Sequence, residues 1–340
     1  MTDTFSPQHS RLHLTIDLDA PGRQSGDLML KWSDNAVPLG YHPIPVISLR
    51  GKPGPSVLIL GGTHGDEFEG PAAILRLAAQ LNPSDLTGQV ILIPALNAPA
   101  FLASSRVSPL DGQNLNRAFP GTANGGPTAM LAHFVETVLL PRVDAAIDLH
   151  SGGKASVFEP CALAARGDDA DLTASNMELA CAFGLPLIWV LGAHNDNRSV
   201  NAAAARVGVP MIAAELSGGG GVDPHAADLA ETGLKRCLKH LGILPGGAPD
   251  PVSTQCVEIA DPLHSVHAPA DGLFDRRCTA GQQVKRGDLA GTLHFPAEPE
   301  RSVVELKFPT AGHVLAHGNR GMVRRGDLLA LVAQPLSEER

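Results

Sequence analysis

Short apolar runs alternate with longer segments of helical periodicity from about residue 56 onward. The runs "SVLILGG", "QVILIPALN", "DAAIDLH", "PLIWVLG" and "PMIAAELS" have the length and composition of buried strands. The segments between them predict helices over 70–81, 171–184, 199–208 and 224–241. This alternation predicts an α/β fold, with a largely parallel or mixed sheet that helices cover on both faces. Strand-like pieces in the first 55 residues, "LHLTIDL" and "IPVISLRG", predict additional edge strands.

The pattern changes at residues 242–255, a segment rich in Pro and Gly, and short strands and turns follow it. Residues 267–293 and 307–332 form an internal repeat, in which each copy ends in a V-x-R-G-D-L hairpin. The repeat resembles the barrel-sandwich fold of biotinyl and lipoyl carrier domains. Arg301 stands where such carriers place their modifiable lysine, so the resemblance supports the shape alone. We predict a catalytic domain over 1–245 and a smaller all-β barrel-sandwich domain over 255–335.

Composition narrows the range of partners. The 340 residues include 26 Lys and Arg against 35 Asp and Glu, and no basic run argues for nucleic acid or an anionic membrane. No apolar run approaches the roughly 20 residues that span a bilayer, and no secretion signal is visible. Five scattered cysteines without a C-x-x-C pair suit a reducing compartment. We therefore predict a cytoplasmic protein with a small-molecule partner, and the sequence leaves a homo-oligomer open.

Three predicted strands end in side chains that can bind a metal ion. His64 and Glu67 follow the first strand in H-x-x-E spacing, His150 ends "DAAIDLH", and Glu215 lies near the tip of "PMIAAELS". The carboxyl ends of parallel strands share one edge of a sheet, so these four groups can converge. Two imidazoles and one carboxylate form the ligand set of many catalytic zinc sites. The second carboxylate is then available as a general base.

The residues around this set have simpler interpretations as well. Asp148 lies two residues before His150, on the same strand face, and can orient a metal-bound imidazole. Each histidine taken alone could equally be a hydrogen-bonded structural residue, and Glu215 alone could pair with an arginine. Asp66 and Glu69 are expected to be turn and helix-start residues, which the helix dipole favours.

A polar segment, "SSRVSPLDGQNLNRAFPG", follows the second strand and contains Arg106, Asn114, Asn116 and Arg117. Arginine suits carboxylate binding and carbonyl polarisation, while asparagine can hold a carboxylate or an amide. Composition alone fits a solvated surface loop equally well.

Four motifs, "GGTHGDE", "DGQNLNR", "DLHSG" and "AELSGG", resemble in order and spacing the succinylglutamate desuccinylase/aspartoacylase family, which has the zinc carboxypeptidase fold. The resemblance covers about residues 45–240 and implies one zinc ion per chain, a general base and acid, and a substrate-binding group. The residues that it implies for these roles are His64, Glu67 and His150 for zinc, Glu215 for the base, Asn116 and Arg117 for the substrate carboxylate, and Arg106 for the carbonyl. Position 114 is Asn where the family usually has Asp.

The resemblance implies a zinc-dependent amide hydrolase that acts on an N-acylated amino acid. Length, the "HGDEFEGP" motif and the C-terminal repeat look most similar to the deacetylases of N-α-acetyl-L-2,4-diaminobutyrate in ectoine breakdown. Residues 101–220 include seven basic and eleven acidic side chains, and this balance favours a substrate with one carboxylate and one ammonium. The alternatives are another N-acyl amino acid deacylase, a short-peptide carboxypeptidase, or a non-enzymatic scaffold with the zinc fold.

Overall fold

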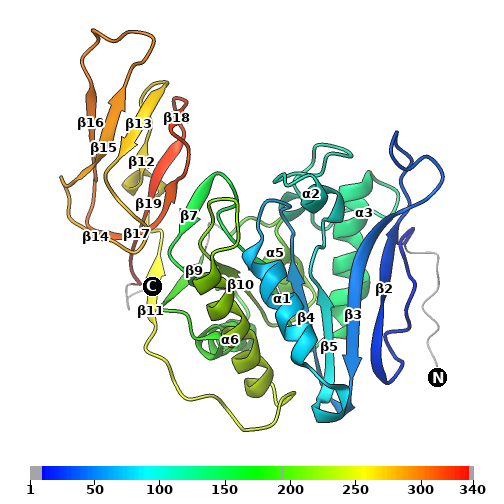
Figure 1. Cartoon of the computed structure of the whole chain (residues 1–340). Helices are drawn as coiled ribbons and strands as arrows, with labels where there is room; N and C mark the ends of the chain where they lie inside the picture. The colour runs from blue at the N-terminus through cyan, green and yellow to red at the C-terminus, as the bar shows by residue number, and fades with distance from the viewer. Residues whose placement is uncertain (1–9, 193–194, 337–340) are drawn as a thin grey trace.

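Between residues 52 and 240 helical segments separate most of the strands, as the hydrophobic pattern predicts, whereas residues 10–50 form strands without a helix between them (Figure 1). The computed structural model describes residues 10–192 and 195–336. The helices are α1 (Glu69–Gln80), α2 (Ala98–Leu102), α3 (Pro127–Phe134), α4 (Ala170–Phe183), α5 (Val200–Arg206) and α6 (Pro224–His240). Short helical turns are η2 (Pro83–Asp85), η3 (Leu115–Arg117), η4 (Val135–Leu139), η5 (Leu140–Arg142) and η6 (Pro262–His264). None of the helices within the described ranges combines the length and apolar character needed to cross a bilayer.

The strands of the α/β part form one mixed sheet. They are β1 (His13–Leu14), β2 (Gly22–Leu30), β3 (His42–Arg50), β4 (Lys52–Gly61), β5 (Thr87–Ile93), β6 (Ala145–His150), β7 (Ser156–Phe158), β8 (Cys161–Ala165), β9 (Leu187–Leu191) and β10 (Met211–Glu215). The order is β1-β2-β3-β5-β4-β6-β10-β8-β9, with β5, β4, β6 and β10 parallel. The predicted mixed sheet is therefore confirmed, and three of the strands that carry candidate site residues are direct neighbours.

Alternate residues of the central strands belong to two different cores. Val57 and Ile59 of β4 pack with α1, α4 and α6 on one face, whereas Leu58 and Leu60 pack with α3, η4 and α5 on the other. This alternation follows from the two-residue period of a strand. On the first face, α1 and α6 lie side by side, and Arg76 of α1 pairs with Asp228 of α6 at 2.7 Å (Figure 1). The prediction of helices on both faces is confirmed.

The hydrophobic pattern does not predict some of the strands correctly. The edge strand predicted at "LHLTIDL" has only two residues, and it pairs with the longer β2, whose first six residues, "GRQSGD", contain no large apolar side chain. The pattern does not predict β8, because its sequence, "CALAA", has the small residues of a helix and no β-branched side chain. It runs antiparallel to β10, so its direction is set by tertiary packing.

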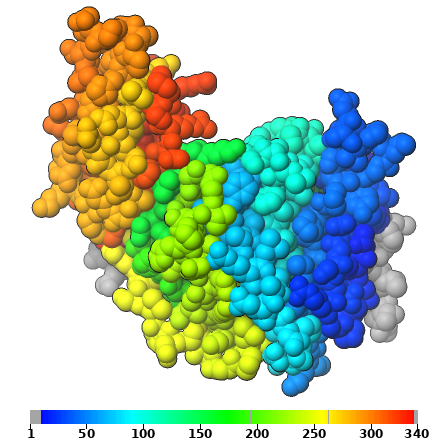
Figure 2. Space-filling model, in the orientation of Figure 1, coloured from blue at the N-terminus to red at the C-terminus, as the bar shows by residue number. Residues whose placement is uncertain are grey.

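The C-terminal strands form antiparallel sheets that project from one end of the α/β part (Figures 1 and 2). They are β11 (Gln255–Glu258), β12 (Val266–His267), β13 (Gly272–Arg276), β14 (Gln283–Val284), β15 (Leu289–His294), β16 (Val304–Lys307), β17 (Gly312–Gly318), β18 (Met322–Val323) and β19 (Leu328–Pro335). One sheet has the order β16-β15-β13-β18, while β19, β17 and β14 continue the main sheet through β11. The predicted domain boundary, at residues 245 to 255, stays a prediction because hydrogen-bonded pairing continues across it.

The two copies of the repeat make the same turn. In the first copy Asp288 accepts a hydrogen bond from the backbone N–H of Lys285 at 2.8 Å, and in the second Asp327 accepts one from Arg324 at 2.8 Å. Each turn then exchanges two backbone hydrogen bonds with the other copy, the first with Phe308 and the second with Ala268. The repeat therefore folds as two mutually bonded halves, as its sequence symmetry predicts.

Gly65 provides a test of how closely the loop after β4 packs. A Cβ at this position would overlap the backbone of Ala100 and Phe101 at α2. Gly65→Ala should therefore lower the free energy of unfolding by at least about 2 kcal/mol, since overpacked backbone must move. Gly167→Ala is the control, because a Cβ there meets nothing within 4 Å. Equal melting temperatures for the two variants would show that the backbone of this loop can move to accept a Cβ without loss of stability.

Candidate metal centre and active site

The carboxyl ends of β4, β6 and β10 bring the predicted residues together. His64 and Glu67 lie in the loop between β4 and α1, His150 is the last residue of β6, and Glu215 is the last residue of β10. The register pairs Glu215 directly with His150, and β6 lies between the other two strands. Three chain segments distant in sequence thus meet at one edge of the sheet.

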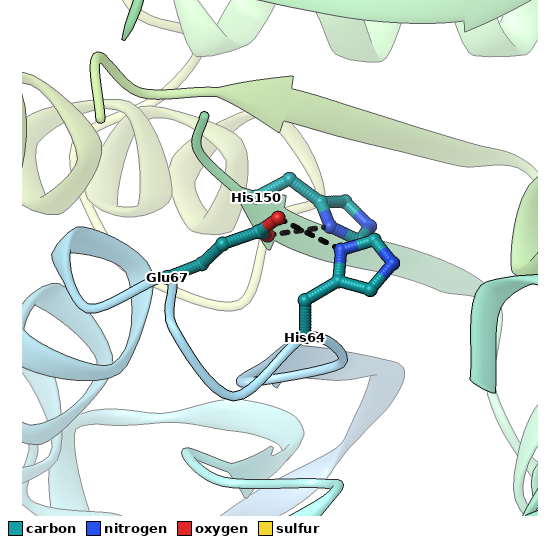
Figure 3. Close-up of side chains that lie close together, drawn as sticks. All are labelled: His64, Glu67 and His150. Atoms are coloured by element: carbon teal, nitrogen blue, oxygen red, sulfur yellow. Dashed lines mark hydrogen bonds and ion pairs between the residues drawn. The ribbon is translucent and has the colours of Figure 1, made fainter. Parts of the chain in front are cut away.

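Both imidazoles face the carboxylate of Glu67 (Figure 3). Nδ1 of His64 lies 2.8 Å from Oε1 of Glu67, and Nδ1 of His150 lies 2.9 Å from Oε2. The three donor atoms lie within 4.8 Å of one another, and all three residues are buried. Among the described residues, this is the one group of three or more His, Cys, Asp or Glu with such spacing.

The other ring nitrogen of each histidine lies close to an oxygen, with hydrogen-bond geometry at His64 and ion-pair distance alone at His150. Nε2 of His64 lies 3.1 Å from Oδ1 of Asn114, and Nε2 of His150 lies 2.7 Å from Oδ2 of Asp148. Asp148 is fully buried and also accepts a hydrogen bond from the hydroxyl of Thr63 at 3.0 Å. An oxygen acceptor beside Nε2 favours the ring proton on that nitrogen, so that the Nδ1 lone pair becomes available to a metal ion.

The charges around Glu67 and His150 favour a bound cation. Burial alone would raise the pKa of Glu67, but the imidazoles of His64 and His150 outweigh it and hold that pKa well below its usual range. Burial alone would lower the pKa of His150, but Asp148 and Glu67 raise it well above its usual value. The two buried carboxylates, Asp148 and Glu67, therefore favour positive charge on the imidazole of His150. A divalent cation would supply the same charge, and two imidazole nitrogens with one carboxylate suit zinc.

Glu215 has a different environment from Glu67. Its Oε2 is buried and has no hydrogen-bond partner among the described residues. Burial raises the pKa of Glu215 to about 8, with a further increase from the negative charge of Glu67, while His150 and Arg106 oppose the change. A carboxylate with a pKa near neutrality is suited to take up and release a proton.

The predicted substrate-binding loop reaches the same place. Arg106 donates to Oε1 of Glu67 at 3.2 Å, and its side chain is about half exposed. Asn116 accepts a hydrogen bond from the backbone N–H of Val200 at 3.0 Å, and Nε of Arg117 lies 3.0 Å from Oδ2 of Asp196. The structure thus brings Arg106, Asn116 and Arg117 to the site and does not leave them on a separate surface loop.

One cavity of about 360 Å³ is lined by all of the predicted site residues except Asp148. Its volume is near the lower end of the roughly 300–1,000 Å³ common for small-ligand sites. Phe158, Leu163, Trp189, Leu191 and Ala213 supply an apolar wall. Polar lining residues come from the segment before α5 and its first turn, together with Asn116; they are Asn195, Asp196, Ser199 and Asn201. The cavity therefore has a metal-ligand end, an apolar wall and a polar wall.

The C-terminal strands support this cavity. β7, which lines the cavity with Ser156 and Phe158, pairs antiparallel with β17. Asn319 donates its backbone N–H to the carbonyl of Ala155 at 2.8 Å, and Ala155 also lines the cavity. One wall of the site thus depends on hydrogen bonds from a part of the chain about 160 residues further on.

Asp66 and Glu69 contribute more to the structure than the expected roles of a turn residue and a helix-start residue. Glu69 is the first residue of α1, but it is fully buried. Asp66 is buried and accepts a hydrogen bond from the backbone N–H of Lys154 at 3.0 Å. Asp66 therefore fastens the segment after His150 to the loop that carries His64 and Glu67.

Comparison with known proteins agrees with the geometry. Residues 53–241 match the family described as the succinylglutamate desuccinylase/aspartoacylase catalytic domain. A relative from Halomonas elongata, N-alpha-acetyl-L-2,4-diaminobutyric acid deacetylase, is 33% identical over 326 residues, which are 96% of this chain and 95% of the relative.

Two solved structures are similar over nearly the whole chain. The product-bound ectoine utilization protein EutE (DoeB) from Ruegeria pomeroyi has a TM-score of 0.91 at 34% identity, covering 95% of this chain and 98% of that one. A succinylglutamate desuccinylase/aspartoacylase from Rhodobacter sphaeroides has a TM-score of 0.90 at 33% identity, covering 96% and 100%.

Sequence reasoning missed several residues of the site. Trp189, Asp196 and Asn201 line the cavity, yet none belongs to a motif that marks it, and Thr63 lies within "GGTHGDE" but its contact with Asp148 was not predicted. Position 114 departs from the family pattern, and the contact of Asn114 with His64 gives that departure a structural meaning. Such contacts form between segments far apart in the chain, so local pattern carries no signal for them.

Glu215 makes a prediction about stability and pH in the metal-free protein. Its folded pKa of about 8 lies above the ordinary value of 4.5, so between these values the folded protein holds a proton that the unfolded chain releases. The contribution of Glu215 is therefore present at low pH and is lost as the pH rises toward 8. Glu215→Gln cannot ionise, so its melting temperature relative to wild type should increase between about pH 5 and about pH 8.

The measurement is thermal unfolding in chelator at both pH values. Glu178→Gln, at an exposed position outside the cavity, is the control. A constant difference between wild type and Glu215→Gln across this range would contradict the raised pKa.

Proposed function

The chain belongs to the succinylglutamate desuccinylase/aspartoacylase family of amide hydrolases, and from this premise we propose that it is a zinc-dependent deacetylase of N-α-acetyl-L-2,4-diaminobutyrate. The products would be diaminobutyrate and acetate, a step of ectoine breakdown. The observation that carries the proposal is the convergence of His64, Glu67 and His150 beside the buried carboxyl of Glu215 in one cavity. The named relative and the ectoine utilization structure support the choice of substrate.

His64, Glu67 and His150 would hold one zinc ion per chain through the two Nδ1 atoms and the carboxylate. A zinc ion, when bound, would lower the pKa of the attacking water and polarise the acyl carbonyl. Asn114 and Asp148 would orient the two imidazoles through their Nε2 atoms. Asn in place of Asp at position 114 leaves one imidazole with a neutral partner and the other with an anionic one.

The remaining residues carry the proton and hold the substrate. Glu215 would take the proton from the attacking water as the new C–O bond forms, then give it to the leaving amine as the C–N bond breaks. Arg106 would donate to the acyl oxygen as negative charge develops on it. Asn116 and Arg117 would bind the substrate carboxylate, and the contact of Arg117 with Asp196 fixes its guanidinium.

The charge balance of the cavity supports a substrate with a single carboxylate. Among the described residues that line it, Arg106 and Arg117 are the Arg or Lys side chains, and both have proposed roles. The acidic side chains are Glu67, Asp196 and Glu215. A second substrate carboxylate, as in acetylaspartate or succinylglutamate, would meet no further cation and would be repelled.

We further propose that the C-terminal strands form the predicted barrel-sandwich domain and serve to hold the cavity wall. The pairing of β7 with β17 and the contact of Asn319 with Ala155 support this role. The antiparallel strands and the mutual bonds between the repeat halves support the shape.

The metal content tests the proposed ligands. Purified wild type should carry about one zinc ion per chain, and His150→Ala should lose most of it because a three-ligand site loses a donor. His267→Ala, at an exposed histidine of β12 outside the cavity, is the matched control and should keep full content. Full zinc content in folded His150→Ala would remove His150 from the site.

The substrate is tested by comparing kcat/KM for N-α-acetyl-L-2,4-diaminobutyrate, N-acetylaspartate and N-succinylglutamate. We expect the first to be highest, because the cavity offers cationic partners for one carboxylate. A dianionic substrate that equals the diaminobutyrate derivative in kcat/KM would overturn the substrate assignment and leave the amide hydrolase.

Glu215→Gln should retain zinc and lose at least about 10²-fold in kcat, the lower range for loss of a general base.

A further inference from the structure

Asn201 is a buried polar residue that the proposed chemistry does not use. It is the second residue of α5, its exposed fraction is 8%, and it lines the cavity. Its side-chain Oδ1 is buried and accepts no hydrogen bond from any described residue. Leaving an amide oxygen unpaired in the folded state destabilises the protein, so such a group needs an explanation.

Two contacts place Asn201 next to the proposed carboxylate-binding pair. The N–H of Val200, the residue before it, donates to Oδ1 of Asn116 at 3.0 Å. Asp196, which lies five residues before Asn201, pairs with Arg117 at 3.0 Å. The segment 196–201 is therefore fastened to the residues proposed to hold the substrate carboxylate. A substituent on the substrate's α-carbon would lie against this segment.

The same cavity also has apolar lining residues. Ala213 lies two residues before Glu215 on β10, so both side chains point to the same face of the sheet. Leu163 of β8 and Trp189 of β9 extend this surface, and all three residues line the cavity with Asn201. A short methylene chain that ends in a hydrogen-bond donor matches a cavity with these apolar residues and the unpaired Oδ1 of Asn201.

Asp196 is a weaker candidate to bind that donor, although it is charged and lines the same cavity. Both of its oxygens already accept hydrogen bonds from the Arg198 guanidinium, at 3.0 and 2.8 Å, and Oδ2 also pairs with Arg117. These arginines hold the pKa of Asp196 well below its usual range. Its hydrogen-bonding capacity is thus used in fixing Arg117.

We propose that Asn201 is the residue that determines specificity for the substrate side chain, with its Oδ1 accepting a hydrogen bond from the terminal ammonium of an N-acyl diamino acid. The inference rests on the proposed function and adds the residue that selects the amine. A hydrogen bond to a charged group contributes about 10- to 100-fold in equilibrium or rate ratios. The same unpaired acceptor would select against a substrate that ends in a methyl group.

The test compares two isosteric substrates, N-α-acetyl-L-2,4-diaminobutyrate and N-acetyl-L-norvaline, which differ in a terminal ammonium or methyl group. Wild type should prefer the first in kcat/KM by about 10-fold or more. Asn201→Leu should reduce this preference by about 10-fold or more, whereas Asn201→Asp keeps an acceptor and should retain it. Asn197→Ala, an exposed position on the same segment outside the cavity, is the control and should match wild type.

Stability gives a second, independent measurement. If Oδ1 is unpaired without substrate, Asn201→Leu should melt at the same or a higher temperature than wild type, because it removes an unsatisfied buried group. A residue with a merely structural role would lose stability on this change.

The outcomes separate the two proposals. An unchanged preference in folded Asn201→Leu, or a wild type that hydrolyses both substrates equally, overturns the role of Asn201 and leaves the deacetylase. A wild type with bound zinc that hydrolyses neither substrate overturns the proposed function, and the role of Asn201 with it.

Discussion

The parallel alignment of β4, β6 and β10 is the constraint on which the site depends. Because the three strands run in the same direction and are neighbours, their carboxyl ends reach one edge of the sheet. The loop after β4 and the last residues of β6 and β10 then bring two imidazoles and two carboxylates within reach. The two cores on either face of the sheet hold these strands in register, so stability of the fold and geometry of the site have the same source.

The two site carboxylates show how position sets chemistry. Glu67 lies between two imidazoles, and its pKa is held low, whereas Glu215 is buried beside that negative charge with an unpaired oxygen and a pKa of about 8. One is suited to bind a cation and the other to exchange a proton. In both histidines Nδ1 faces Glu67, while Nε2 lies near Asn114 in one ring and near Asp148 in the other.

The cavity depends on parts of the chain that carry no catalytic group. β7 forms one wall because β17 pairs with it, and the segment 196–201 forms another because Asn116 and Arg117 bind it. The wall built by β8, β9 and β10 also packs on Leu315 and Ala333 in a small shared core. The C-terminal strands are thus continuous with the site in packing as well as in hydrogen bonding.

The sequence by itself determined the elements whose signal is local. The apolar runs of β4, β6 and β10, the helical periodicity of α1, α4 and α6, and the residue types at strand ends are all set by neighbours within a few positions. Side-chain type also limits chemistry, so His64, Glu67, His150 and Glu215 stand out by residue type and by their places at predicted strand ends. The four motifs added the family.

Only the tertiary structure decided the features that depend on distant contacts. The antiparallel direction of β8, the extent of β2, the choice of Nδ1 over Nε2, and the unpaired oxygen of Asn201 each result from packing between segments far apart in the chain. The contact between Asn116 and Val200 joins residues 84 positions apart. Local pattern carries no information about such pairs, because the energy that selects them arises only when the whole sheet has formed.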